Sequence, residues 1–213
     1  MQSKLLPVFI VAAIVQMAVL AGAVFVGQKL TETNHQIERS QEILYRAASM
    51  ERSVLSANMS GSNFLSSLGD SDSDDKSKSA PVAEDVYQKG VQELARLEKL
   101  CQSDSYYSEP LAKLKKILDA MRLLSEKMAT QMAESKSEGM TGALKVIPAV
   151  KALYAVVDKM NTRINGMVEH EEAQTAGLLA VRDQYEQMQT VLLFSALVLA
   201  LGGAALIPAL MKR

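Results

Sequence analysis

Two stretches near the ends of the chain are apolar over their whole length, and the region between them alternates between apolar and polar positions. Residues 5–26 and 191–210 contain no charged residue, and Gln16 is the one strongly polar side chain in the first of them. At 1.5 Å per residue, each stretch is long enough to cross a hydrocarbon layer of about 30 Å. Both stretches are therefore predicted to be membrane-spanning helices.

Basic residues flank the outer end of each apolar stretch. Lys4 precedes the first, and Lys212 and Arg213 follow the second, although Lys29 lies on the opposite flank of the first. Because cytoplasmic flanks of membrane helices are enriched in Lys and Arg, both termini are predicted to be cytoplasmic and the middle region extracytoplasmic. The expected location is the plasma membrane, with the chain crossing it twice.

A cleaved signal peptide is the alternative interpretation of the first stretch. Ala21-Gly22-Ala23 fits the small-x-small cleavage pattern, and Lys4 provides a short basic region before the apolar run. The run continues to Val26, however, which makes it longer than the apolar part of a usual signal peptide. Even after cleavage, the second stretch would still tether the chain to the membrane.

The middle region is predicted to be one helical domain. Residues 1–27 form the N-terminal membrane helix, 28–189 the extracytoplasmic domain, and 190–213 the C-terminal membrane helix with a short basic tail. Apolar spacings of three, four or seven predict four helices, with a Ser- and Asp-rich linker at 69–81, a polar turn at 102–108 and glycines ending the third helix. Their expected ranges are 28–68, 84–101, from Pro110 to the glycines at 139 and 142, and 148–190, with Pro148 marking either a kink or the start of the fourth.

The longest apolar stripe lies on the fourth helix. Steps of three and four give ten apolar or aromatic positions, and this repeat predicts bundle or coiled-coil packing: Val150, Leu153, Val157, Met160, Ile164, Met167, Leu178, Val181, Tyr185 and Met188. Glu171 and Gln174 interrupt the stripe at successive positions. We interpret these two as a candidate polar switch layer that weakens packing and allows two helix arrangements. The alternative is that the fourth helix extends beyond its neighbours here, so that the stripe is partly exposed.

Helix lengths favour a specific fold class. The first and fourth helices would reach about 60 Å and 64 Å from the membrane, and such matched lengths fit helices that leave and return side by side. We therefore predict an all-α, membrane-anchored, up-down-up-down four-helix bundle with two transmembrane helices.

Composition narrows the function classes. The net charge is −1 and no basic cluster stands out, so no nucleic-acid partner is expected. Cys101 is the only cysteine, which excludes an internal disulfide. The chain has no Trp and 12 Met, and we interpret the methionines as adaptable core residues.

The layout resembles the input end of bacterial sensor histidine kinases. Residues 142–174 are similar to the last helix of the third type of CHASE domain, in which an apolar repeat precedes an acidic stretch, here residues 169–172. Residues 55–70 fall where that family tends to show Glu-Thr-Gly-x-Arg-Gly-aromatic-Leu-Leu-x-Gly-Asp. The bundle domain of methyl-accepting chemotaxis receptors resembles the region nearly as well.

The match to that second motif is partial. Gly61, Gly69 and Asp70 match in place, and Ser60 stands for the Thr. Met59 and Asn63 replace the family's Glu and Arg, so the role of that charged pair is not carried over. The resemblance implies an extracellular sensing module anchored in the bacterial inner membrane.

The sequence offers little that could carry catalysis. A calcium loop starting at Asp70 would need Gly and Glu where Asp75 and Pro81 stand. His35 and His170 would differ in height by about 16 Å on continuous helices, too far apart to share one metal ion. Phosphate-binding loops and nucleophile elbows are absent from the sequence as well. We predict no catalytic residue, no metal, no cofactor and no enzyme activity in this chain.

The leading functional hypothesis is a membrane-bound signal-input module that passes helix shifts through the two spans. The expected partners are the lipid bilayer, a second copy in a homodimer, and a histidine kinase or another signalling protein. The sequence ends three residues after the second apolar stretch, so an output module would belong to a longer chain or to a partner. The rival hypothesis is a structural coiled-coil scaffold of the cell envelope.

Overall fold

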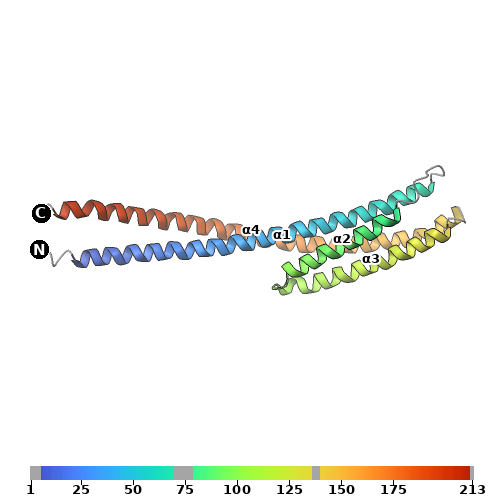
Figure 1. The fold of residues 1–213 in the computed structure, drawn as a ribbon, viewed down its shortest axis with the longest axis horizontal. Coiled ribbons are helices and arrows are strands. Elements are labelled where there is room, and N and C mark those ends of the chain that lie inside the picture. The colour runs from blue at the N-terminus through green and yellow to red at the C-terminus, as the bar shows by residue number, and fades with distance from the viewer. Residues whose placement is uncertain (1–5, 70–78, 136–139, 212–213) are drawn as a thin grey trace. The chain divides into compact units, whose positions relative to one another are not determined.

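The computed structural model describes the backbone of residues 6–69, 79–135 and 140–211, and side chains within 9–53, 55, 87–131 and 144–204. The described residues form four α-helices and one short 3₁₀ helix, without a strand (Figure 1). In chain order these are α1 (Leu6–Gly69), α2 (Ser79–Leu100), η2 (Ser105–Tyr107), α3 (Ser108–Ser135) and α4 (Met140–Met211). The predicted all-α class is confirmed.

The chain forms two compact units, and α1 and α4 contribute to both. Unit 1 comprises residues 1–39 and 174–213, and unit 2 comprises residues 40–173. Unit 2 therefore lies entirely within the region 28–189 that the sequence analysis assigns to one domain. It holds the second half of α1, all of α2 and α3, and the first half of α4.

Unit 1 contains the two apolar stretches. Both helices have windows that are long and apolar enough to cross a membrane by length and composition, with mean hydropathies of 2.6 for α1 and 1.6 for α4. Large apolar side chains in these windows are exposed on the isolated chain, among them Met17, Val24 and Phe194. A helix that is apolar on all sides and exposed within its own fold is typical of a membrane span.

Small residues bring the two helices of unit 1 together. A Cβ atom at Gly22 would lie 3.6 Å from Leu192, and one at Gly27 would lie 3.2 Å from the Gln189 amide nitrogen. These pairs show that α1 and α4 run antiparallel here, as Figure 1 also shows. Ala23, Val26 and Ala196 are buried. Such a seam of small residues is how helices approach closely in a lipid environment, where no hydrophobic effect drives them together.

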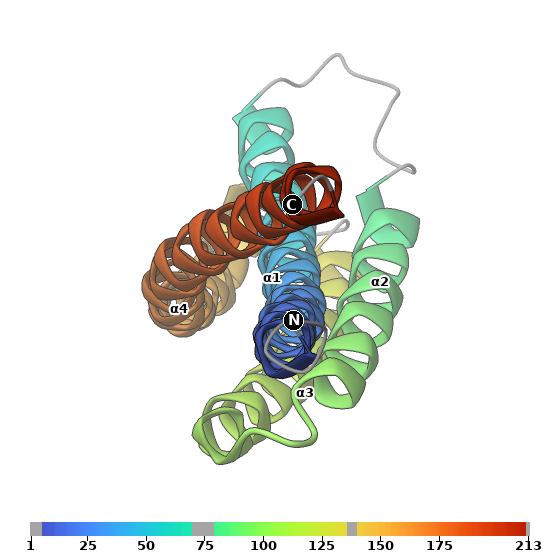
Figure 2. The same ribbon diagram turned by 90° about the vertical axis from the view of Figure 1, so that its left-hand side faces the viewer.

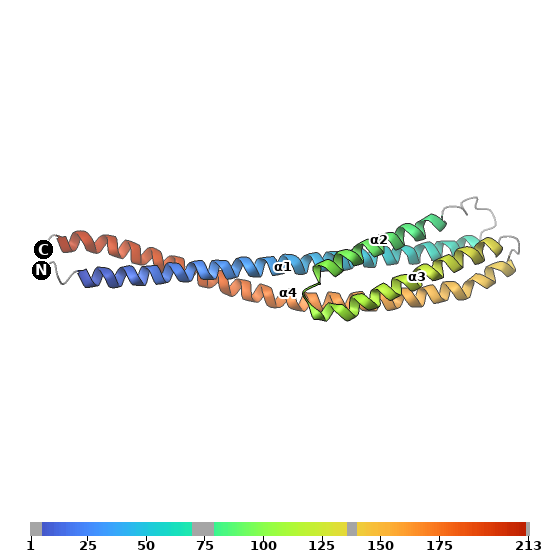
Figure 3. The same ribbon diagram turned by 60° about the horizontal axis from the view of Figure 1, so that its bottom comes forward.

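All four helices supply side chains to a single core in unit 2. Figure 3 shows α1, α2, α3 and α4 alongside one another in this unit. α1 contributes Ile43, Ala47 and Met50, and α2 contributes Leu94 and Leu97. The rest of the core comes mainly from α3 and α4, through Leu111, Leu114, Leu118, Met121, Met128, Val146, Ala149, Val150, Leu153, Val157, Met160, Ile164 and Met167. The three-four spacing places these residues on one face of each helix, and burial of that face stabilises the unit.

Two helices begin earlier in the chain than the sequence pattern suggests. α2 starts at Ser79, where Pro81 in the first turn is tolerated because its missing N–H would have no helical partner. α4 starts at Met140, so the prediction that Gly142 ends a helix was wrong. Pro148 lies inside α4, and the buried neighbours Val146, Ala149 and Val150 offset the hydrogen bond that proline cannot donate. Residues 70–78 and Gly139 lie outside the described residues.

The connection between α2 and α3, a short loop in Figure 2, is capped by side-chain hydrogen bonds. The Asp104 side chain accepts a hydrogen bond from the backbone N–H of Tyr106 at 3.0 Å, and the Ser108 hydroxyl donates to the Ser105 carbonyl at 2.9 Å. The first contact is a typical N-cap. This turn fixes the orientation of two consecutive tyrosines, Tyr106 and Tyr107, against the core.

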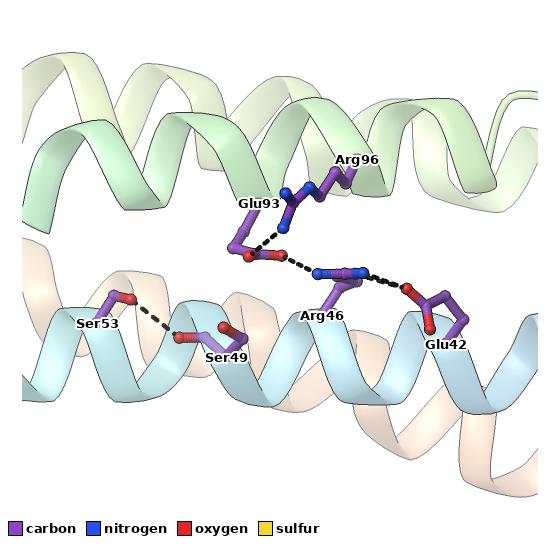
Figure 4. A network of polar contacts seen from close by, with 6 residues as sticks. All are labelled: Glu42, Arg46, Ser49, Ser53, Glu93 and Arg96. Atoms are coloured by element: carbon purple, nitrogen blue, oxygen red, sulfur yellow. Dashed lines mark hydrogen bonds and ion pairs between the residues drawn. The ribbon is translucent and has the colours of Figure 1, made fainter.

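Ion pairs join α1 to α2 at the side of the core (Figure 4). Glu93 is buried and accepts from Arg46 of α1 at 3.3 Å and from Arg96 at 2.9 Å, while Arg46 also contacts Glu42 at 2.6 Å. A nearly buried carboxylate needs such partners, because an unpaired one would lose its hydration without compensation. The network fixes the register of the two helices.

Candidate functional site

The most unusual group in the core of unit 2 is the carboxylate of Glu171 on α4. Glu171 is only 2% exposed, and its side chain accepts hydrogen bonds from the hydroxyls of Ser40 on α1 and Tyr107 on η2. Ser40 also lies 3.5 Å from the backbone carbonyl oxygen of Glu171. One acidic side chain is thus bound by two other elements of the unit. We call Ser40, Tyr106, Tyr107, His170 and Glu171 the Glu171 cluster.

Tyr107 is completely buried, and its phenol donates directly to Glu171. Burial is the main cause that raises the pKa of Tyr107 well above its usual range, and the hydrogen bond to the Glu171 carboxylate adds to the effect. The phenol therefore remains a proton donor throughout the physiological pH range. Glu171 therefore accepts a hydrogen bond from the Tyr107 hydroxyl throughout this pH range.

Two aromatic rings cover the cluster. Tyr106 stacks on the imidazole of His170 with 3.6 Å between ring centroids and 14° between the ring planes. Tyr107 meets both rings edge-on, at 5.1 Å from Tyr106 and 5.7 Å from His170. The Tyr106 hydroxyl donates to the Gly166 carbonyl at 3.4 Å, which ties the α2–α3 turn to α4. Tyr107 therefore packs against both rings while its hydroxyl binds Glu171.

No cation forms an ion pair with Glu171 in the part of the chain that the structure describes. Burial of a carboxylate is costly, and within the described ranges two hydroxyl groups offset the lost hydration. Such a layer is weaker than apolar packing of the same size, yet it specifies which helix faces meet. The cluster is therefore a local weak point that joins α1, α4 and the α2–α3 turn.

The predicted stripe on α4 divides at this cluster. Residues Val150, Leu153, Val157, Met160, Ile164 and Met167 are all buried in unit 2. In unit 1, Leu178 and Tyr185 are half-buried, whereas Val181 and Met188 are 40% and 51% exposed. Of the two candidate switch residues, Glu171 is buried and Gln174 is exposed. Glu171 therefore belongs to a polar layer, and Gln174 lies on a surface.

The other residues singled out from the sequence contribute less. His35 lies on an exposed face of α1 within unit 1 and contacts Glu38 at 3.3 Å. Among the described side chains, no group of three or more His, Cys, Asp or Glu residues could hold a metal ion. Asp70 and Asp75 lie outside the described residues, as do Lys4, Lys212 and Arg213. The surroundings of the family-motif positions are not described either, namely those of Met59, Ser60, Gly61, Asn63 and Gly69.

Sequence reasoning missed three members of the cluster. Ser40 occupies a position equivalent to those of Ile37, Ile43 and Ala47 on the buried face of α1, so a hydroxyl at an apolar position was the available signal. Tyr106 and Tyr107 were assigned to a polar turn, and the aromatic character of Tyr107 was the one signal of its burial. His170 was considered singly, without the ring that stacks on it.

Comparisons of the chain with protein-family models, with curated proteins and with solved structures found no match.

Proposed function

We propose that this protein is a membrane-bound signal-input module, a sensor of the kind found in bacterial two-component or chemotaxis-like receptors. In this proposal the two apolar stretches span the plasma membrane, both termini are cytoplasmic and unit 2 is extracytoplasmic. The helices of unit 2 form an up-down-up-down bundle of the third CHASE type. A small shift of α4 passes through the membrane to a histidine kinase or another signalling protein.

The observation that carries the proposal is the buried carboxylate of Glu171 on α4. The same unbroken helix contains Glu171 and the apolar stretch 191–210. Because two hydroxyls from other elements bind this carboxylate, a shift of α4 would break both hydrogen bonds and allow new ones to form. Packed helices that have two discrete arrangements are the usual element of such switches, and a polar layer lowers the free-energy difference between them.

A second copy of the chain is the proposed partner along α4. Val181 and Met188 continue the buried stripe at the same spacing but are exposed on the single chain. Exposed apolar positions in a sustained three-four repeat are typical of a coiled-coil seam. In the proposed homodimer, the α4 helices of two copies cover each other along this stripe.

The test uses the full chain in membranes, in a Cys101→Ala background with one new cysteine at Val181 or Met188. Oxidative crosslinking of these thiols reports how closely the two α4 helices approach. Glu171→Gln removes the buried charge while keeping the side-chain shape, and Glu172→Gln makes the same change at a neighbouring exposed residue. We expect Glu171→Gln to change the crosslinking rate several-fold, and Glu172→Gln to leave it unaltered.

Two results would overturn parts of the proposal separately. Absence of crosslinks at both positions contradicts the homodimer. Crosslinks that form equally in the parent, Glu171→Gln and Glu172→Gln chains contradict transmission along α4. That second result favours the other candidate, a coiled-coil scaffold of the cell envelope, which the long continuous helices α1 and α4 would also suit.

A further inference from the structure

A groove between α3 and α4 in unit 2 concentrates positive charge. It has a volume of about 360 Å³ and is lined by Lys113, Lys116 and Ile117 of α3 and by Lys159, Thr162 and Arg163 of α4. The volume is at the lower end of the range for small-molecule sites. On each helix the lining residues follow the spacing i, i+3, i+4, so they lie on one face of that helix.

The arrangement of these cations is unfavourable without a negatively charged partner. Lys113 and Lys116 are three residues apart on one helix, and Lys159 and Arg163 are four apart on the other. Like charges at such spacings destabilise a helix by a few tenths of a kcal/mol per pair. Facing helices in bundles usually place opposite charges at such flanking positions. Here four cations share one groove.

Among the described residues, the carboxylate of Glu109 neighbours this groove, although Glu109 does not line it. Glu109 forms an i,i+4 ion pair with Lys113, and its pKa is lowered first by that hydrogen bond and then by the charges of Lys113 and Arg163. Within the described residues, Lys116 and Lys159 make no ion pair with any carboxylate. The Thr162 hydroxyl donates to the Asp158 carbonyl at 2.9 Å, so its oxygen is turned to an internal partner. Two lysines thus remain for an external anion.

We propose that this groove binds an anion whose charge is carried by carboxylate or phosphate groups. Lys116 and Lys159 would bind its anionic groups from opposite helices, with Arg163 as a planar donor for carboxylate or phosphate. The half-buried Ile117 offers an apolar floor for a short carbon skeleton. The site shares no residue with the Glu171 cluster, and its binding does not depend on whether the chain signals.

Two sources could supply this chemistry, a soluble anion or the headgroup of an anionic lipid. The experiment uses the full chain in nanodiscs of zwitterionic phosphatidylcholine, titrated with citrate or with inorganic phosphate and followed by calorimetry. Sodium chloride at matched ionic strength controls for screening. A second arm replaces part of the lipid by phosphatidylglycerol, without added anion, and follows the thermal unfolding midpoint.

The decisive variants are Lys116→Gln with Lys159→Gln, against Lys115→Gln with Lys151→Gln. Both pairs remove one exposed lysine from α3 and one from α4, but the second pair lies outside the groove. We expect saturable binding that weakens about tenfold or more in the groove variant and changes less than about twofold in the control, since each lost contact is a charge-assisted hydrogen bond. A response confined to phosphatidylglycerol discs, lost in the groove variant, assigns the site to a lipid headgroup.

The proposal is overturned if neither probe binds saturably and phosphatidylglycerol has no effect, or if both variant pairs weaken binding equally. Because the readout is binding alone, these results leave the crosslinking test of signal transmission unaffected.

Discussion

Tyr107 donates a hydrogen bond to Glu171 at a point where both side chains are buried, and the two residues come from different elements, η2 and α4. The contact joins the turn between α2 and α3 to the helix that leads into the second apolar stretch. Substitution of either Tyr107 or Glu171 therefore tests this hydrogen bond.

Loss of the Glu171 carboxylate alone should destabilise unit 2. Glu171→Ala leaves the hydroxyls of Ser40 and Tyr107 without this acceptor and opens a small cavity, so we expect a loss of about 1–3 kcal/mol in the free energy of unfolding. The triple variant Ser40→Ala, Tyr107→Phe, Glu171→Met removes all three polar groups together. It should equal or exceed the parent in stability, because apolar packing often replaces a buried polar cluster without loss.

Denaturation of the full chain in detergent, followed by circular dichroism, measures both effects. The exposed neighbour Glu172→Ala serves as the control and should change stability by less than about 0.5 kcal/mol. A triple variant less stable than Glu171→Ala would show that the cluster stabilises the unit, and would remove the physical basis for a weak layer.

Alkaline pH should act on stability through Tyr107. Its folded-state pKa is raised by burial and by Glu171, so the folded phenol keeps its proton above pH 10 while the unfolded phenol ionises near that value. The unfolded state then binds fewer protons than the folded state, so stability falls as pH rises past about 10. Tyr107→Phe has no phenol to ionise and should lose less stability over the same range.

Thermal unfolding midpoints between pH 7 and 11 test this expectation. The parent should be more stable than Tyr107→Phe at pH 7, and the difference should shrink above pH 10. Tyr45→Phe removes a phenol that is 59% exposed and should follow the parent curve. Parallel curves for the parent and Tyr107→Phe would contradict the assigned environment of this phenol.

Close approach of α2 and α3 depends on Gly90. A Cβ atom there would lie 3.0 Å from the Leu118 side chain, so Gly90→Leu should overpack the core and cost about 1–3 kcal/mol. Gly166 on α4 has nothing within 4 Å of such an atom, so Gly166→Ala should stabilise by up to about 1 kcal/mol through helix propensity. Thermal unfolding midpoints of the two variants test both expectations. A tolerated Gly90→Leu would mean that α2 and α3 are further apart than described.

Periodicity along the chain was sufficient to predict helices, because their core positions repeat at three and four residues. The burial of Leu153, Met160 and Met167 follows directly from that repeat. Periodicity alone could not locate helix starts such as Met140, since the burial of Val146 in the core, just before Pro148, outweighs the proline effect.

The sequence pattern identified Glu171 but not the residues that contact it. Glu171 stood out as a charge in an apolar repeat, but its partners come from positions 131 and 64 residues away in the chain. No local rule pairs such residues. The groove between α3 and α4 was missed for the same reason, because its cations are unremarkable on either helix alone and meet only across the helix pair.

The proposed membrane topology predicts which introduced cysteines a water-soluble maleimide can reach. The exposed fraction of the side chains alone does not predict this. Asp119 on α3 and Phe194 on α4 are both exposed on the isolated chain, the latter by 67%. In the proposed topology, Asp119 faces water outside the cell and Phe194 faces lipid. Maleimides react with the thiolate, which forms readily in water and hardly at all in hydrocarbon.

Single cysteines at these positions, in the Cys101→Ala background, should therefore behave differently in intact cells. A membrane-impermeant maleimide should label Asp119→Cys within minutes and leave Phe194→Cys unlabelled. After solubilisation and denaturation, both should be labelled, which confirms that each thiol is present and reactive. If Phe194→Cys were labelled in intact cells, residues 191–210 could not lie in the bilayer. Labelling of Asp119→Cys only after the cells are opened would place unit 2 in the cytoplasm and reverse the proposed orientation, since the inner membrane excludes the reagent.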